Sequence, residues 1–163
     1  MRLQSVAIVL TAILAGQPCV SRTAYADPSG ELQARIGSIQ NAMRNRKVAR
    51  VEILSVPPRI ETDIAITSAA LEKQPEYRLI IRDISVLALR EKLSKALDTV
   101  IVTPSSELGD YRWGVVFYDD QGKRIMGIFF APDGRHGAID SATALVDGQL
   151  YRWLTRTYAD CFQ

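Results

Sequence analysis

The only histidine of the chain lies in its most concentrated polar segment, Asp133-Gly134-Arg135-His136-Gly137. Histidine is the one side chain that acts as a general base near neutral pH without help from its surroundings. A carboxylate beside the ring would orient it as in a catalytic triad, and Asp133 and Asp140 are the nearest in sequence. A hydroxyl nucleophile would come from Ser105, Ser106 or Ser141. These residues define one hypothesis, a small hydrolase that uses His136 with Asp133 or Asp140.

The pattern around these residues argues against that hypothesis. No serine stands in a Gly-x-Ser-x-Gly elbow, which would present its hydroxyl at a sharp turn. Polar turns of Asp, Gly and Arg are also common between strands, where a histidine is simply solvated. A thiolate pair of Cys161 with His136 is disfavoured because Cys161 lies two residues from the end of the chain, where termini fray. The hydrolase is therefore the alternative interpretation.

Other catalytic and cofactor chemistries have weak support. Two acids in a Pro/Ser/Gly-rich loop, Glu107 and Asp110, could form a carboxylate pair of the glycosidase kind, while Asp119 and Asp120 are better explained as turn formers. One His and two Cys cannot build a Cys/His metal cluster, and no spaced Asp ladder suits Ca²⁺. With no glycine-rich phosphate loop or Cys-x-x-Cys pair, we expect no metal and no cofactor.

A segment of alternating aromatic and apolar residues, Tyr111–Tyr118, offers the best candidates for a binding surface. Alternation places Tyr111 and Trp113 on one face of the expected strand and Arg112 and Tyr118 on the other. Half of the aromatic residues should belong to the core. We expect Arg112 and Tyr118 to be exposed and, together with Trp113, to contact a partner.

The first 26 residues have the three parts of an export signal. Met1 and Arg2 make a positive start, Val6–Gly16 is an apolar run too short to span a bilayer, and Ala24-Tyr25-Ala26 supplies the small residues that a signal peptidase recognises. A lipid anchor on Cys19 is disfavoured because Pro18 precedes it. We expect a signal peptide over 1–26 and a mature chain that begins at Asp27, in the bacterial periplasm or secreted.

Composition bounds what the mature chain can do. Of the 163 residues, 47% are hydrophobic and 23% are charged, as in an average globular protein. Removing residues 1–26 leaves 137 residues, enough for one domain over 27–163, with equal numbers of basic and acidic side chains. Such a balance gives no long-range field for nucleic acid. Cys161 is left without an intrachain partner, so it is buried, free, or the bridge of a homodimer.

The periodicities predict an α+β fold with a mainly antiparallel sheet. Helices are predicted over 30–46, 67–73, 85–97 and 149–160. Ser29 and Thr67 are the expected caps of the first two. The third has Arg90, Glu91, Lys92 and Lys95 on its solvent side, and the last has Trp153 on its apolar face. Strands are predicted over 48–56, 77–84, 99–103, 111–118, 123–131 and 138–145, the last three forming a C-terminal hairpin and meander. Residues 125–130 are apolar on both faces, which predicts a central strand covered on both sides.

These observations favour a small exported α+β module that binds and does not catalyse. Its expected partner is a protein or a component of the cell envelope, with no nucleic acid and no integral membrane segment after the signal is removed.

The export signal makes a prediction about the purified protein. Expressed with its own leader in a Gram-negative host, the chain should be recovered outside the cytoplasm with Asp27 as its first residue. Intact mass spectrometry of periplasmic and cytoplasmic fractions measures this directly. Uncleaved chain confined to the cytoplasm would contradict the prediction.

Overall fold

The computed structural model describes residues 27–82, 84 and 87–162, so the predicted signal peptide lies outside it. Seven antiparallel strands form one sheet in the order β2-β1-β4-β5-β6-β7-β3. The strands are β1 (Arg50–Ser55), β2 (Tyr77–Ile81), β3 (Ile101–Pro104), β4 (Trp113–Tyr118), β5 (Arg124–Phe130), β6 (His136–Ile139) and β7 (Ala142–Asp147). The helices are α1 (Pro28–Arg44), α2 (Ser68–Lys73), α3 (Leu87–Asp98) and α4 (Leu150–Tyr158), followed by a 3₁₀ turn, η1 (Ala159–Phe162).

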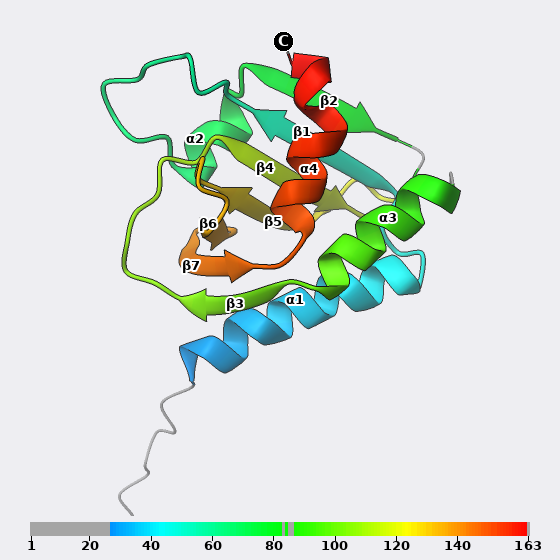
Figure 1. Ribbon diagram of the computed structural model, residues 1–163. Coiled ribbons are helices and arrows are strands. Elements are labelled where there is room, and N and C mark those ends of the chain that lie inside the picture. Colours follow the sequence, from blue (N-terminus) through cyan, green and yellow to red (C-terminus); the bar gives the residue numbers. More distant parts are fainter. Residues whose placement is uncertain (1–26, 83, 85–86, 163) are drawn as a thin grey trace, which may run out of the picture.

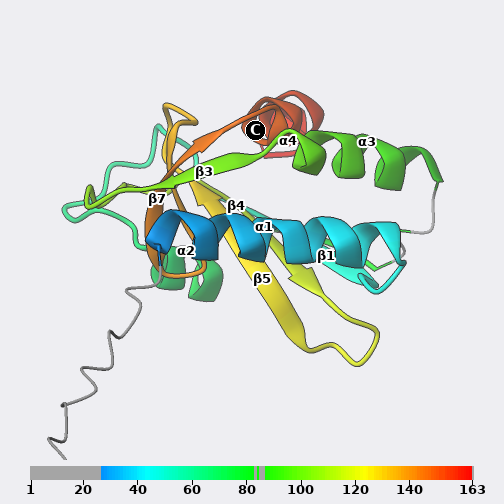
Figure 2. The same cartoon turned by 90° about the horizontal axis from the view of Figure 1, so that it is seen from below.

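The prediction of an α+β fold with a mainly antiparallel sheet is confirmed. Helices α1, α3 and α4 lie on one side of the sheet and α2 on the other (Figures 1 and 2). Strand β5 is fourth of the seven strands, so the expected central position of residues 125–130 is also confirmed. Among the described residues, none of the helices is both long and apolar enough to cross a membrane.

The larger core cluster lies between the sheet and the three helices. It contains the apolar stripes predicted for the helices, including Ile36 and Ile39 of α1, Leu93 and Leu97 of α3, and Leu154 of α4. Alternate residues of the central strands meet them, namely Val115 and Phe117 of β4 and Met126, Ile128 and Phe130 of β5. All of these side chains are at most 3% exposed, so their apolar surface is removed from water.

A smaller cluster covers the opposite face of the sheet. Leu54, Val116 and Phe129 point to this side and pack with Leu71 of α2, Tyr111, and residues of the segment before α2. The predicted cap of α2 is confirmed, because the Thr67 hydroxyl accepts a hydrogen bond from the Ala70 N–H. A short helix and an irregular loop therefore cover the second apolar face of the central strands.

Three local predictions need correction. Asp27, and not Ser29, caps α1, and its carboxylate accepts from the Ser29 N–H. Tyr111 precedes β4 and packs in the smaller cluster, so it does not share a face with Trp113. The predicted strand over 138–145 is two strands, β6 and β7, because Asp140 adopts a positive φ of 57° and reverses the chain. The predicted start of the third helix, at Ser85 and Val86, lies outside the described residues.

A network of charges ties the layers together at that reversal. The Asp140 carboxylate accepts from Arg124, at 2.5 Å, from the backbone N–H of Gly127, at 2.8 Å, and from Arg35 of α1. Arg124 also forms a two-point ion pair with Glu72 of α2, with N···O distances of 2.7 and 3.0 Å. The network links a helix on one face, the central strand, and the helix on the other face. Although desolvation opposes it, hydrogen bonding to Glu72 and Asp140 raises the pKa of Arg124.

The packing around β5 makes Gly127 a sensitive position. A Cβ there would lie 2.7 Å from both an Arg124 Nη atom and the Phe129 ring. We expect Gly127→Ala to lower the free energy of unfolding by about 1–3 kcal/mol. In α1, Gly37→Ala is the matched control, since nothing lies within 4 Å of its Cβ, and it should stabilise by about 0.5–1 kcal/mol. Urea denaturation measures both, and equal effects would contradict the packing argument.

Candidate functional site

His136 lies at the start of β6 with a carboxylate at each ring nitrogen. Its Nδ1 pairs with Asp133, and its Nε2 lies 2.8 Å from an Oε atom of Glu107. The Asp133 carboxylate also accepts from the backbone N–H groups of Arg135 and His136. The structure therefore brings His136 together with one of its two predicted partners, and adds Glu107 from the loop after β3.

The two carboxylates favour the charged form of His136. Its hydrogen bond to Asp133, assisted by the charges of Asp133 and Glu107, raises the pKa of His136 above its ordinary value of 6.5. Desolvation would raise the pKa of Asp133, but the bonds from His136 and the backbone outweigh it and lower that pKa. An imidazolium is a donor at both nitrogens and has no lone pair to take a proton. Through its charge interactions with Asp133 and Glu107, His136 links the turn over 131–135 to the loop over 105–112.

The predicted pairing of His136 with Asp140 is wrong. Asp140 is engaged with Arg35, Arg124 and the Gly127 N–H in the network described above. The Ser105 hydroxyl accepts from the Glu107 N–H at 3.1 Å, which makes it part of the local turn. Asp140 is only four residues from His136 in sequence. At the reversal between β6 and β7, however, its carboxylate binds the residues named above and not the imidazole.

The expectation that Arg112 is exposed is also wrong. Arg112 is only 7% exposed, and its guanidinium donates to Asp110 Oδ2 at 2.7 Å, the Ile60 carbonyl at 2.7 Å and Thr62 Oγ1 at 3.2 Å. Asp110 in turn accepts from the Ile66 N–H at 2.8 Å. Arg112 therefore anchors the segment between β1 and α2 to the sheet, and its side chain is turned inward to reach those carbonyl and carboxylate oxygens.

The other two predicted contact residues have different surroundings. Trp113 is 8% exposed and belongs to the larger core cluster, so it offers little surface to a partner. Tyr118 is half-buried; its hydroxyl donates to Glu52 at 3.4 Å, and the Arg50 guanidinium lies 3.9 Å from its ring centroid. Burial is the main cause of a raised pKa for Tyr118. Of the three residues, only Tyr118 keeps substantial surface.

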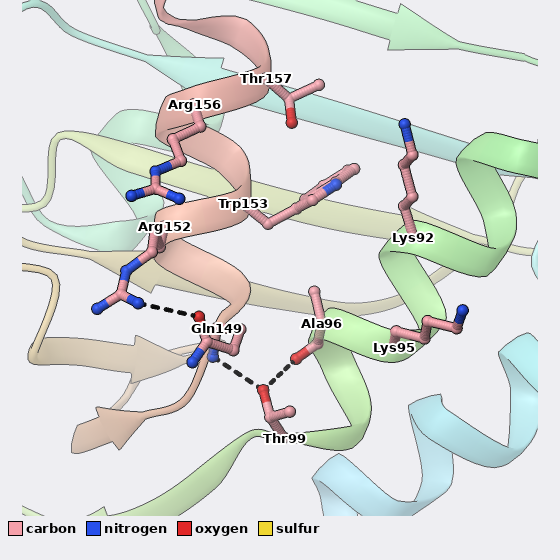
Figure 3. Close-up of a pocket in the computed structure, with 9 residues that line it drawn as sticks. All are labelled: Lys92, Lys95, Ala96, Thr99, Gln149, Arg152, Trp153, Arg156 and Thr157. Atoms are coloured by element: carbon pink, nitrogen blue, oxygen red, sulfur yellow. Dashed lines mark hydrogen bonds between the residues drawn. The ribbon is translucent and has the colours of Figure 1, made fainter.

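A groove between α3 and α4 is the most promising binding site in the described part of the chain (Figure 3). Its volume is about 440 Å³, within the range of small-ligand sites. Trp153 extends from α4 toward α3 and lies across the gap (Figure 3). The lining residues are Lys92, Lys95, Ala96, Thr99, Gln149, Arg152, Trp153, Arg156 and Thr157.

The groove has a strongly positive rim. Lys92 and Lys95 lie on α3, and Arg152 and Arg156 lie one turn apart on α4. Among the described residues, no carboxylate lines the groove. It also adjoins the N-terminus of α4, where Gln149 makes no side-chain cap and the helix dipole adds partial positive charge. An anion placed here would meet attraction from both helices.

The groove keeps its shape through contacts at the end of α3 and along α4. The Thr99 hydroxyl accepts from the Gln149 N–H at 2.8 Å and donates to the Ala96 carbonyl at 2.7 Å (Figure 3). The Trp153 ring packs edge-on against Tyr158, with centroids 5.5 Å apart. The end of α3 is thereby joined to the start of α4, and the indole is held from one side.

Sequence reasoning did not find this groove. The lysines of α3 were expected on a solvent face and Trp153 on the apolar face of the last helix, and neither pattern shows that the two helices lie side by side. The one available signal is that residues 149–158 contain two arginines and no acid.

Cys161 is expected to be buried, free or the bridge of a homodimer, and the first of these predictions is wrong. The residue is exposed in η1, one turn after the last residue that lines the groove. Its position leaves the thiol accessible to other molecules.

The contacts of His136 predict a measurable titration. The imidazole should titrate above pH 6.5, and Asp133→Asn should lower the midpoint because it removes the principal acceptor. The stabilisation by charged His136 is complete below its unfolded pKa and is lost as pH rises through the raised folded pKa. NMR of the imidazole Cε1–H against pH measures the midpoint. Asp119→Asn, in the turn after β4, is the control and should leave it unchanged.

Comparison with protein-family profiles, curated proteins and solved structures finds no match to this chain.

Proposed function

We propose that this protein is an exported, non-enzymatic binding module that holds an anionic partner in the groove between α3 and α4. The single observation that supports it best is the set of four cations around Trp153, with no carboxylate among the described lining residues. The partner would be a protein or a component of the cell envelope. The proposed location is the periplasm or the outside of the cell.

The cations of the groove differ from the arginines that form ion pairs within the fold. Arg35, Arg78 and Arg124 all pair with carboxylates, and Arg44 pairs with Asp98 at 2.7 Å. Within the described part of the chain, Lys92, Lys95, Arg152 and Arg156 form no ion pair, and Arg152 has only a 3.4 Å contact to the Gln149 amide oxygen. Their charges are therefore uncompensated by the protein itself, which favours an anionic ligand.

The hydrolase alternative has less support. Its favourable observation is the pairing of His136 with Asp133, as expected for an oriented base. The other ring nitrogen, however, faces Glu107 and no hydroxyl, so the arrangement stabilises a charged imidazole. A hydrolase would need a hydroxyl in place of Glu107 at that nitrogen, whereas a binding role uses a groove that is already formed.

The exposed Cys161 is compatible with a disulfide-linked homodimer in an oxidising compartment. We propose this as a secondary property, because binding in the groove does not require it.

The charge of the groove can be tested with model anions. Isothermal titration would use polyglutamate, oligogalacturonate and phosphatidylglycerol vesicles, each at low and at physiological salt. At least one should bind, with weaker binding at higher salt because exposed charges are screened. The double variant Arg152→Ala/Arg156→Ala should weaken that binding about tenfold, or about 1.4 kcal/mol.

The matched control removes two charges on the opposite face of the sheet. Arg59→Ala/Lys73→Ala changes exposed residues of the loop after β1 and of α2, and should leave binding within about twofold. If none of the three anions binds, or if both double variants weaken binding equally, the groove is not an anion site and the proposal is wrong.

A further inference from the structure

We infer that the ligand of the groove is an acidic oligosaccharide, a short chain of sugar rings that carries carboxylates or similar anionic groups. This inference rests on the proposed function and names the chemical class of the partner. It follows from three features of the lining: an aromatic side chain between the helices, neutral hydrogen-bonding groups at both ends, and cations along both rims.

Trp153 supplies a flat apolar surface in the middle of the groove. The indole lies across the gap between α4 and α3, with Ala96 opposite it (Figure 3). A sugar ring has an apolar face of C–H groups that packs against an aromatic ring while its hydroxyls stay at the edge. The indole N–H is buried without a hydrogen-bond partner in the described part of the chain, and its nitrogen lies on the α3 side (Figure 3). A hydroxyl inserted between the helices would supply the missing acceptor.

The neutral polar residues of α4 form a line with the indole. Gln149, Trp153 and Thr157 are spaced by four residues, so they lie on the same side of the helix in steps of about 6 Å. The Gln149 amide and the Thr157 hydroxyl thus stand at the two ends of the groove (Figure 3). A row of amide, indole and hydroxyl matches a chain of rings that bears hydroxyls at regular intervals.

The cations run beside this line on both helices. All four residues line the groove, and the Lys92 side chain runs along the gap (Figure 3). The guanidinium groups of Arg152 and Arg156 extend on the side of α4 away from α3, and the Lys95 ammonium extends on the side of α3 away from α4 (Figure 3). Their arrangement along the groove suits an anionic group repeated on successive rings more than one phosphate. Acyl chains of a lipid would leave Gln149 and Thr157 without partners, and an acidic peptide would leave the flat face of Trp153 without a matching ring. The observations therefore favour the acidic sugar chain.

Binding probes that carry sugar rings, negative charge, or both can separate these occupants. Oligogalacturonate carries both, its fully methyl-esterified form keeps the rings without the charge, and polyglutamate keeps the charge without the rings. Phosphatidylglycerol vesicles represent a lipid surface. By isothermal titration, we expect oligogalacturonate to bind at least about tenfold more tightly than each of the others, the difference being about 1.4 kcal/mol.

Two variants connect this preference to the groove. Trp153→Leu should weaken oligogalacturonate binding at least tenfold and leave polyglutamate binding nearly unchanged. Because Trp153 is partly buried, Thr157→Val serves as a second test on an exposed residue and should cost several-fold in affinity. Its control is Thr155→Val, a threonine outside the lining whose hydroxyl donates to the Tyr151 carbonyl. That variant should bind as the parent does.

The outcomes distinguish the two proposals. Tight binding of polyglutamate or vesicles without a preference for oligogalacturonate would overturn this inference and leave the anion-binding function standing. Equal binding of the methyl-esterified oligomer would overturn it as well, since charge would then play no part. If no anionic probe binds, the proposed function and this inference both fail.

Discussion

The structure depends on the fact that its two central strands are apolar on both faces. Phe117 and Ile128 point to one side of the sheet, and Val116 and Phe129 point to the other, all of them fully buried. A sheet of this kind is stable only if both faces are removed from water. Three amphipathic helices cover one side. The other side is covered by α2 and an irregular loop that the buried Arg112 holds in place through backbone and side-chain oxygens.

This constraint also decides where function can lie. The helices on the first face bury their apolar stripes, so their charged residues gather on outer surfaces, where α3 and α4 lie next to each other. The interior accepts few charges, and the two buried charged residues of the described chain, Glu52 and Arg112, are paired with Arg78 and Asp110. Among the described residues, the four cations that line the groove with Trp153 form no ion pair, and the proposed function depends on this. Net charge near neutrality conceals this uneven distribution.

The polar residues of the most familiar catalytic types are bound to partners within the chain. His136 joins two segments through Asp133 and Glu107, while Asp140 joins three layers. Each of these residues is satisfied by partners within the chain. Trp153, by contrast, keeps a buried donor without a partner beside a preformed groove. Arg50 Nε is a second buried donor without a hydrogen-bond partner among the described residues, so the candidate site is distinguished by an unsatisfied donor together with a groove.

The amino-acid sequence by itself determined the elements with a strong local period. The hairpin of β4 and β5, the apolar faces of α1, α3 and α4, and the Thr67 cap all follow from patterns within a few residues, because side-chain direction repeats along a helix or strand. Only the tertiary structure decided which of the polar residues would meet. The inward turn of Arg112, the reversal at Asp140 and the groove that joins Thr99 to Gln149 all depend on partners distant in sequence. No local pattern encodes such partners, since they are selected by how the layers pack.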